Sequence, residues 1–180
     1  ARRGLVARAE TWTDGEHWLP VLRQAHDVHG NVTRIRDAEG GTLERDYDDA
    51  GLFPVEERLL VDDGTLVTRA TWDPRHGHPR TVTVPSGATT EAVYDGLGRL
   101  VAEVRPGDTA DRPTVRYRYF LDGSTARPAI VTERRRRSGE DDVDVVLDQL
   151  DGLGRLHAQV TADDAGSGAV LARHPLVNTE

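Results

Sequence analysis

The segment Tyr94-Asp95-Gly96-Leu97-Gly98-Arg99-Leu100 decides the fold, because it recurs along the chain. It returns almost unchanged at 150–156 as Leu-Asp-Gly-Leu-Gly-Arg-Leu, and looser copies begin at His26, Tyr47 and Trp72. The shared pattern is a large ring, an aspartate, two variable positions (three in the Trp72 copy) and a glycine, followed by an alternating segment. A motif that recurs at this spacing is typical of an architectural unit rather than of an active site.

Turn chemistry explains these residue types. An aspartate at the start of a turn accepts backbone N–H groups two residues on, and a glycine supplies the positive φ that a type I turn with a bulge requires. The ring before the aspartate ends a strand, where it can stack on neighbouring hairpins. We therefore predict structural roles for Asp27 and Gly30; Tyr47, Asp48 and Gly51; Trp72, Asp73 and Gly77; Tyr94, Asp95, Gly98, Arg99 and Leu100; and Asp151, Gly154, Arg155 and Leu156.

Alternating polar and apolar residues between these turns predict strands, and no window keeps a helical period with caps. The ring positions of the first four copies are 21, 25 and 22 residues apart. The longer interval to Leu150 holds two units, with a degenerate turn at Leu121-Asp122-Gly123. About two strands per unit gives roughly 12 to 14 strands. We expect an all-β fold of successive antiparallel hairpins forming a curved, twisted sheet over residues 1–180, with turns near 26–32, 47–52, 72–78, 94–100, 119–124 and 150–156.

Three further local features carry predictions. An Asp-Gly pair at 14–15 predicts the first hairpin, and Gly166-Ser167-Gly168 predicts the last turn. A strand that ends in the arginines of 134–137 turns at Ser138-Gly139 into the acidic run 140–144. Opposite charges across a ladder are mildly stabilising, so we expect these two runs to face each other in a hairpin.

The composition excludes several classes of protein. A hydrophobic content of 37% and a mean hydropathy of -0.56 fit sheets with one face in water, and no stretch of 18 apolar residues predicts a membrane span. Cysteine is absent, which excludes disulfides and thiolate chemistry. All 23 basic residues are arginine, yet the net charge is -8, which argues against a nucleic-acid groove. No signal peptide is evident, and the absence of methionine suggests a piece of a longer polypeptide.

The Tyr94–Leu100 motif and its degenerate copies resemble the YD repeats of Rhs proteins. The flanking sequences are similar to those of insecticidal toxin complex B/C components and their SpvB-like relatives. The residues that carry this second resemblance are Arg3-Gly4-Leu5, His29-Gly30-Asn31-Val32-Thr33, Gly51-Leu52-Phe53-Pro54-Val55, Arg105-Pro106-Gly107-Asp108 and Asp151-Gly152-Leu153-Gly154-Arg155. The resemblance covers nearly the whole chain, and the copies at His26 and Leu150 lack the tyrosine.

The resemblance implies a β-ribbon that spirals into a hollow shell around an unfolded toxic C-terminal cargo. It implies secretion, contact with the rest of the same toxin chain and with the cargo, and a translocation-pore component as partner. The autoproteolytic aspartyl site of such proteins has no counterpart here, so no catalytic residue carries over. We expect no enzyme activity, cofactor, nucleic acid or membrane span.

The sequence gives only weak support for metal, calcium, nucleophile or anion sites. His26 with His29, and His76 with His78, have spacings that could share a metal ion, but each pair lacks a third ligand. The aspartates lack the order of a calcium-binding EF-hand loop. The serines at 86, 124, 138 and 167 lie in turn-like sequence without a nucleophile elbow. Arginines 134–137 could bind an anion, although the neighbouring acidic run favours internal pairing.

We therefore expect a structural shell segment. The alternative is a cell-surface module that binds glycan or protein, which exposure of Trp12, Trp18 and Trp72 together would favour; burial of these rings between hairpins favours the shell. A hydrolase would need a concave pocket with convergent polar groups. Unpaired sheet edges and an apolar face predict that the isolated chain aggregates or oligomerises.

Overall fold

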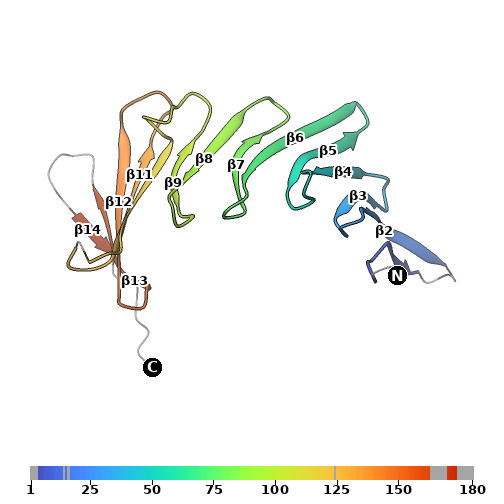
Figure 1. The fold of residues 1–180 in the computed structure, drawn as a ribbon, viewed down its shortest axis with the longest axis horizontal. Coiled ribbons are helices and arrows are strands. Elements are labelled where there is room, and N and C mark those ends of the chain that lie inside the picture. The colour runs from blue at the N-terminus through green and yellow to red at the C-terminus, as the bar shows by residue number, and fades with distance from the viewer. Residues whose placement is uncertain (1–3, 14, 16, 124, 163–169, 174–180) are drawn as a thin grey trace. The chain divides into compact units, whose positions relative to one another are not determined.

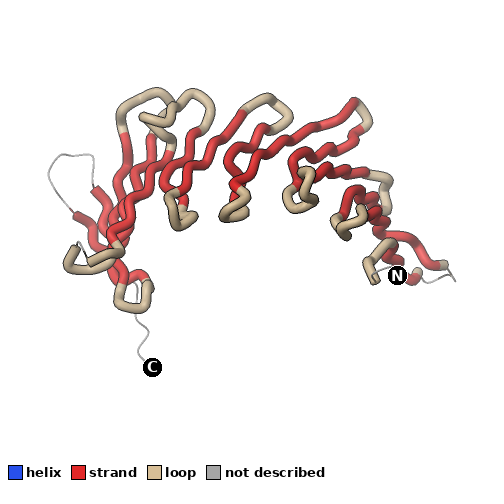
Figure 2. The backbone as a smooth tube through the Cα atoms, in the orientation of Figure 1, coloured by secondary structure: helices blue, strands red, loops and turns tan. Residues whose placement is uncertain are grey.

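The computed structural model describes residues 4–13, 15, 17–123, 125–162 and 170–173 (Figure 1). These residues form strands joined by turns and loops, and they contain no helix (Figure 2). The all-β prediction is therefore confirmed. The fourteen strands are β1 (Arg8–Trp12), β2 (Trp18–His26), β3 (Val32–Asp37), β4 (Thr42–Tyr47), β5 (Pro54–Val61), β6 (Gly64–Asp73), β7 (His78–Thr83), β8 (Thr89–Tyr94), β9 (Leu100–Val104), β10 (Val115–Phe120), β11 (Ala129–Arg135), β12 (Val143–Leu150), β13 (Leu156–Ala162) and β14 (Val170–Arg173).

The chain divides into two compact units, Ala1–Thr89 and Thr90–Glu180. In the first unit β1 to β7 lie side by side in chain order, and in the second β8 to β14 do the same. Every strand pair recorded within a unit is antiparallel, as expected for successive hairpins. Curvature of the sheet over the whole chain stays a prediction.

A register shift accompanies each of the five repeat turns. The shift lies at the ring position itself: it falls at His26, Tyr47, Trp72, Tyr94 and Leu150. A bulge here adds twist and lets the strand enter the turn without disturbing the ladder beyond it. The copies therefore share a backbone geometry as well as a sequence pattern.

The side chains of the first unit alternate between two chemically different faces. On one face Ile35, Leu43, Leu59 and Leu66 stand directly opposite one another across four strands. On the other face the row is Arg34, Glu44 and Arg58. Period-two alternation thus separates a row of apolar side chains from a row of charged ones, although the face of Leu43 also carries the ion pair of Arg45 and Glu57.

Few apolar side chains are buried. In the described residues these are Val104, Val115, Ala129 and Ala158, all in the second unit. A sheet with so little buried core depends on cross-strand pairs and on turn contacts rather than on a second layer. The described residues include no helix long and apolar enough to cross a membrane.

Some boundaries differ from those predicted. β11 ends at Arg135 rather than at Arg137, and the degenerate turn near Asp122 is a longer loop between Phe120 and Ala129. The charged hairpin between β11 and β12 is confirmed, with Arg136 paired to Asp142 and Asp144 and Arg137 paired to Glu140. Arg135 differs, since it pairs with Asp108 in another loop. Asp14 and the predicted turn at 166–168 lie outside the described residues.

Candidate functional site

The repeated aspartates organise the turns through their carboxylates. Oδ1 of Asp95 accepts the N–H groups of Leu97 and Arg99, both at 2.9 Å. Asp151 does the same with Leu153 and Arg155, again at 2.9 Å. One carboxylate oxygen therefore satisfies two backbone donors that the turn would otherwise leave without a partner.

The Asp27 turn repeats this geometry with a neutral partner. Oδ1 of Asp27 accepts the N–H of His29 at 2.8 Å and that of Asn31 at 2.9 Å. Asn31 Nδ2 donates to Oδ2 of Asp27 at 3.0 Å, and also to the carbonyl of Gly51 at 2.7 Å. This second bond joins the turn to the next repeat turn, that of Asp48.

Two turns vary the pattern in step with their loop lengths. Asp48 accepts the N–H groups of Leu52 at 2.7 Å and Phe53 at 3.1 Å, four and five residues after it rather than two and four. Asp73 is almost fully buried and accepts the N–H of Arg75 at 2.9 Å. The Arg75 guanidinium also binds the Asp73 carboxylate, with Nη2 2.8 Å from Oδ2.

The same carboxylate geometry occurs at Asp37, which the sequence did not single out. Its Oδ1 accepts the N–H groups of Glu39 at 3.0 Å and Gly41 at 2.7 Å. The local spacing Asp37-Ala38-Glu39-Gly40 carried the signal, but no ring precedes it. The paired strands beside it also show no register shift. The register shift therefore distinguishes all five repeat turns from this ordinary turn, and a ring precedes four of the five.

Arginine side chains add charge to the two best copies of the motif. Arg99 Nε donates to Oδ2 of Asp95 at 2.7 Å, and Arg155 Nε donates to Oδ2 of Asp151 at the same distance. The backbone N–H of Arg99, followed by its side chain, holds the pKa of Asp95 below its ordinary value of 3.8. The Arg155 N–H and side chain lower the pKa of Asp151 in the same way.

Glycines at the turns serve conformation and, in one case, packing. Gly30, Gly51, Gly77, Gly98 and Gly154 all have φ between 66° and 96°. A side chain strains the backbone in this region. At Gly51 a Cβ atom would also lie only 2.7 Å from Cδ2 of His29, so the imidazole of one turn rests against the glycine of the next.

Three ring residues tie their own hairpin to the one before it. Tyr47 donates through its hydroxyl to the carbonyl of Val32, the first residue of β3, at 3.3 Å. Trp72 Nε1 donates to the carbonyl of Pro54, the first residue of β5, at 2.8 Å. In the second unit Tyr119 donates to the carbonyl of Leu100, the first residue of β9, at 2.8 Å.

These three bonds share one rule. Each ring lies on the strand that leads toward a turn, and its acceptor opens the strand that follows the preceding repeat turn. Stacking adds to the tie, because Trp72 stacks on Phe53 with ring centroids 5.1 Å apart. Arg99 also lies over the Tyr119 ring, 4.5 Å from its centroid. The ring position therefore acts between hairpins, whereas the aspartate acts within its own turn.

Trp12 and Trp18, unlike Trp72, are exposed to solvent. Trp12 and Trp18 face each other across the β1–β2 hairpin in an edge-to-face pair, with centroids 5.3 Å apart. They are 55% and 59% exposed, whereas Trp72 is half-buried. The exposed Trp12 and Trp18 fit the expectation for a binding module, whereas the half-buried Trp72 fits the expectation for a shell.

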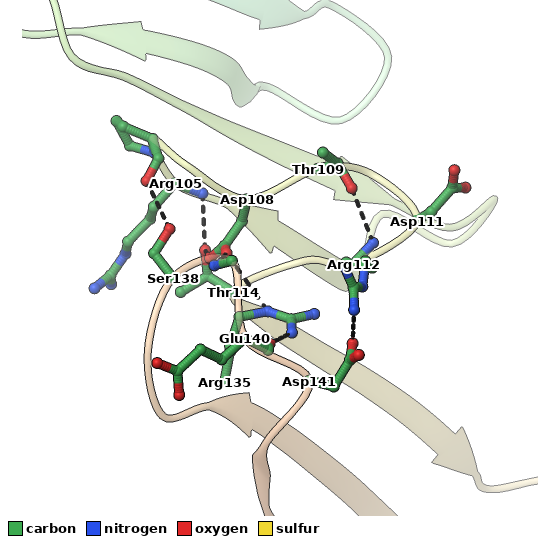
Figure 3. Close-up of polar contacts among 12 residues, drawn as sticks. Arg105, Asp108, Thr109, Asp111, Arg112, Thr114, Arg135, Ser138, Glu140 and Asp141 are labelled. Carbon is green, nitrogen blue, oxygen red and sulfur yellow. Dashed lines mark hydrogen bonds and ion pairs between the residues drawn. The ribbon is translucent and has the colours of Figure 1, made fainter.

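A second polar cluster links two loops of the second unit, 105–114 and 136–142 (Figure 3). At its centre the side chains of Asp108 and Arg135 are 2% and 6% exposed, and Arg135 Nε lies 3.5 Å from Asp108 Oδ1. Asp108 also accepts the hydroxyl of Thr114 at 2.6 Å and the N–H of Gly139 at 2.9 Å. We call this cluster the Asp108 clasp.

The charged and hydroxyl groups of the Asp108 clasp bond to one another and to the two loops. The Thr114 hydroxyl, followed by the Gly139 N–H, lowers the pKa of Asp108. Ser138 Oγ donates to the carbonyl of Pro106 at 3.2 Å, so this serine ties the loops together. Farther out, Arg112 and Asp141 form an exposed ion pair. The arrangement joins two loops rather than opening a site to a substrate.

The candidate metal ligands do not converge. In the described part of the chain no group of three or more His, Asp or Glu side chains is placed to hold a metal ion. The rings of His76 and His78 stack with centroids 6.4 Å apart, and His76 Nδ1 lies 3.8 Å from Oδ2 of Asp73. Arginines 136 and 137 pair with the acidic run across their own hairpin, as predicted.

Comparison with known proteins gives a likeness in structure alone. No protein-family model and no curated protein sequence matches the chain. The crystal structure of TcdB2-TccC3 matches 93% of the chain with a TM-score of 0.66 and 15% sequence identity. That of TcdB2-TccC3-Cdc42 matches 93% with a TM-score of 0.67 and 12% identity.

The chain spans only 11% and 13% of those two longer chains. At such identities the likeness establishes the fold and not the activity. It does agree with the repeated turns and ring ties found here, which are features of an extended repeat. The chain is thus an all-β repeat segment with the fold found in part of the TcdB2-TccC3 toxin complex.

Proposed function

We propose that the chain is a structural segment of a secreted toxin polypeptide, and that it forms part of a β-shell around a toxic cargo. The observation that carries this proposal is the ring tie. Bonds from Tyr47, Trp72 and Tyr119 to the start of a strand in the preceding hairpin let a wall grow by one hairpin at a time. The resemblance to YD repeats and the shared fold with toxin-complex chains support the same function.

The mechanism of such a segment is passive. Its strands supply a wall, and its partners are the rest of the same polypeptide, the enclosed cargo and a translocation-pore component. No catalytic step is assigned to its side chains, because the aspartates and the serine described above are engaged in turns and loop contacts. Secretion belongs to the same proposal.

The test of enclosure is limited proteolysis of the complete polypeptide that carries this chain, with fragments identified by mass spectrometry. We expect one segment outside the repeats to survive protease until denaturant opens the wall. The matched control is the same segment expressed without the repeats, which should be cut at once. Equal cleavage rates in both samples would contradict the enclosing role.

The isolated chain provides an independent prediction. Leu59, Leu60, Val61 and Leu66 all remain more than 40% exposed on β5 and β6, and unpaired strand edges favour association. We expect the 180-residue chain alone to elute from a size-exclusion column as oligomers, with a mass by light scattering that rises with concentration. A well-behaved monomer at all concentrations would count against a wall that needs neighbours.

A second candidate function is a binding module for glycan or protein. The exposed pair of Trp12 and Trp18 favours it, because aromatic faces in water are typical of binding surfaces. The half-buried Trp72, stacked on Phe53 and bonded to Pro54, favours the shell. The repeated ring ties occur in both units, whereas the exposed pair occurs only in the first hairpin, so we favour the shell.

A further inference from the structure

A hollow of about 290 Å³ lies where β2 extends beyond β3. β2 begins at Trp18, but its pairing with β3 begins only at Leu22. Residues 18–21 of β2 therefore have no register partner on β3, and among them Pro20 lines the hollow. The lining comes from β2, the end of β3 and the turn after it: Pro20, Leu22, Arg23, Arg36, Asp37, Ala38, Glu39 and Gly40.

Three arginines form a row across the first strands. Arg8 stands opposite Arg23, and Arg23 stands opposite Arg36. Like charges directly opposite each other on neighbouring strands are destabilising. Arg8 is paired with Glu10, but in the described residues no hydrogen bond or ion pair is recorded for the side chain of Arg23 or Arg36.

The other arginines on this face of the first unit form ion pairs with acidic side chains. Arg34 pairs with Glu44, and Glu44 also lies within 3.5 Å of Arg58. Arg58 binds Asp46 and Glu56 at 2.5 and 2.6 Å, and Arg69 completes the network on Glu56. Arg23 and Arg36 stay outside this network, although the chain carries an excess of acids. Their charge is therefore left for an anionic group from elsewhere.

The surroundings define the kind of anion. Guanidinium groups bind carboxylates with paired hydrogen bonds. Asp37 and Glu39 line the same hollow and would repel a dense polyanion such as a nucleic acid. Pro20 and Leu22 add an apolar floor, and Trp18 and Leu19 are exposed beside it. An unpaired strand edge next to such pockets suits an extended peptide backbone.

We propose that an extended polypeptide segment with alternating acidic and apolar side chains docks in this hollow, with its carboxylates on Arg23 and Arg36. The segment lies along the free edge of β2 and places its apolar side chains against Pro20 and Leu22. This docking does not depend on whether the chain forms a shell, since it uses only residues of the first unit.

The test uses the 180-residue chain and a fluorescent eight-residue peptide of alternating glutamate and valine, followed by fluorescence anisotropy. We expect saturable binding that weakens as salt rises. Replacing both arginines, Arg23→Ser with Arg36→Ser, should weaken binding by about tenfold or more, since each loses a charge-assisted bond. The thermal midpoint of this variant should stay level or rise, because a like-charge pair has been removed.

Three comparisons make the result decisive. The control variant Arg69→Ser with Arg80→Ser changes the net charge equally on β6 and β7 and should bind the peptide almost as wild type does. A peptide of alternating lysine and valine should not bind. Failure of the acidic peptide to bind, equal weakening in the control variant, or tighter binding of oligothymidylate through the same two arginines would each overturn the proposal.

Discussion

Replacing Asp108 with asparagine is expected to lower the midpoint of thermal unfolding by about 10 °C, the largest loss of stability that we predict for one polar side chain. The change leaves the guanidinium of Arg135, only 6% exposed, without a counter-charge. Removing one partner of a buried ion pair generally costs about 3–5 kcal/mol, because the remaining charge stays away from water. Circular dichroism during heating measures the effect.

The exposed pair in the same two loops supplies the control. Asp141 also pairs with an arginine, Arg112, but its side chain is 82% exposed. Asp141→Asn should therefore move the midpoint by no more than about 2 °C, since surface ion pairs contribute little. Arg135→Met in the Asp108→Asn background should recover most of the loss, because a buried unpaired charge is replaced by an apolar side chain. Equal effects of the Asp108 and Asp141 variants would show that the pair is not buried in solution.

The pH dependence of the wild-type chain follows from the direction of the same pKa. The Thr114 hydroxyl and the Gly139 N–H lower the pKa of Asp108 from its ordinary 3.8. A carboxyl with a depressed folded pKa contributes stability that is present above the unfolded value. That stability is lost as the pH falls through the folded value. The gap in midpoint between wild type and Asp108→Asn should therefore be full at neutral pH and close under strongly acidic conditions.

The clasp shows what the sequence could not predict. Arg105-Pro106-Gly107-Asp108 predicts a loop, and Arg134 to Arg137 predict a charged hairpin. Nothing local in either segment indicates that Arg135, which also donates to the carbonyl of Glu140 in its own hairpin, pairs with Asp108. Such a contact depends on which loops fall on the same edge of the sheet. We predicted from the sequence that all four arginines would face the acidic run, because that run is the nearest group of opposite charge along the chain.

The repeat turns could be predicted because their physics is local. The bonds from Asp95 to Leu97 and Arg99 span four residues, and the positive φ of Gly98 follows from the same turn. The ring position was predicted only in part. Stacking between hairpins was expected, but the bonds from Tyr47 to Val32 and from Trp72 to Pro54 were not, because they depend on the spatial neighbour of each ring.

These two kinds of contact divide the work of the repeat. An aspartate turn closes one hairpin and does so without a ring or a bulge beside it, as at Asp37. The ring tie can form only when another hairpin precedes it, because its acceptor lies in that hairpin. A long wall therefore needs both, and a sequence that kept the aspartates but lost the rings would form hairpins without fixing how one hairpin follows another.

Replacing Gly51 with alanine is expected to cost about 2–4 kcal/mol of folding free energy, from two causes that can be separated. The first is backbone strain, since φ at this residue is 66° and an L side chain in that region costs about 1–2 kcal/mol. The second is the His29 ring, which lies 2.7 Å from the position of the new Cβ and must move. Denaturant unfolding followed by tryptophan fluorescence measures the total in the first unit.

Gly154 separates the two causes. Its φ is 78°, but no atom lies within 4 Å of the position of its Cβ. Gly154→Ala should therefore carry the strain alone, about 1–2 kcal/mol. The extra cost at Gly51 should shrink when His29→Ala is combined with Gly51→Ala, and the double-mutant cycle reports that coupling. Equal costs at the two glycines, with no coupling to His29, would mean that the turns do not pack on one another. The repeat would then be held together by its strands and ring ties alone.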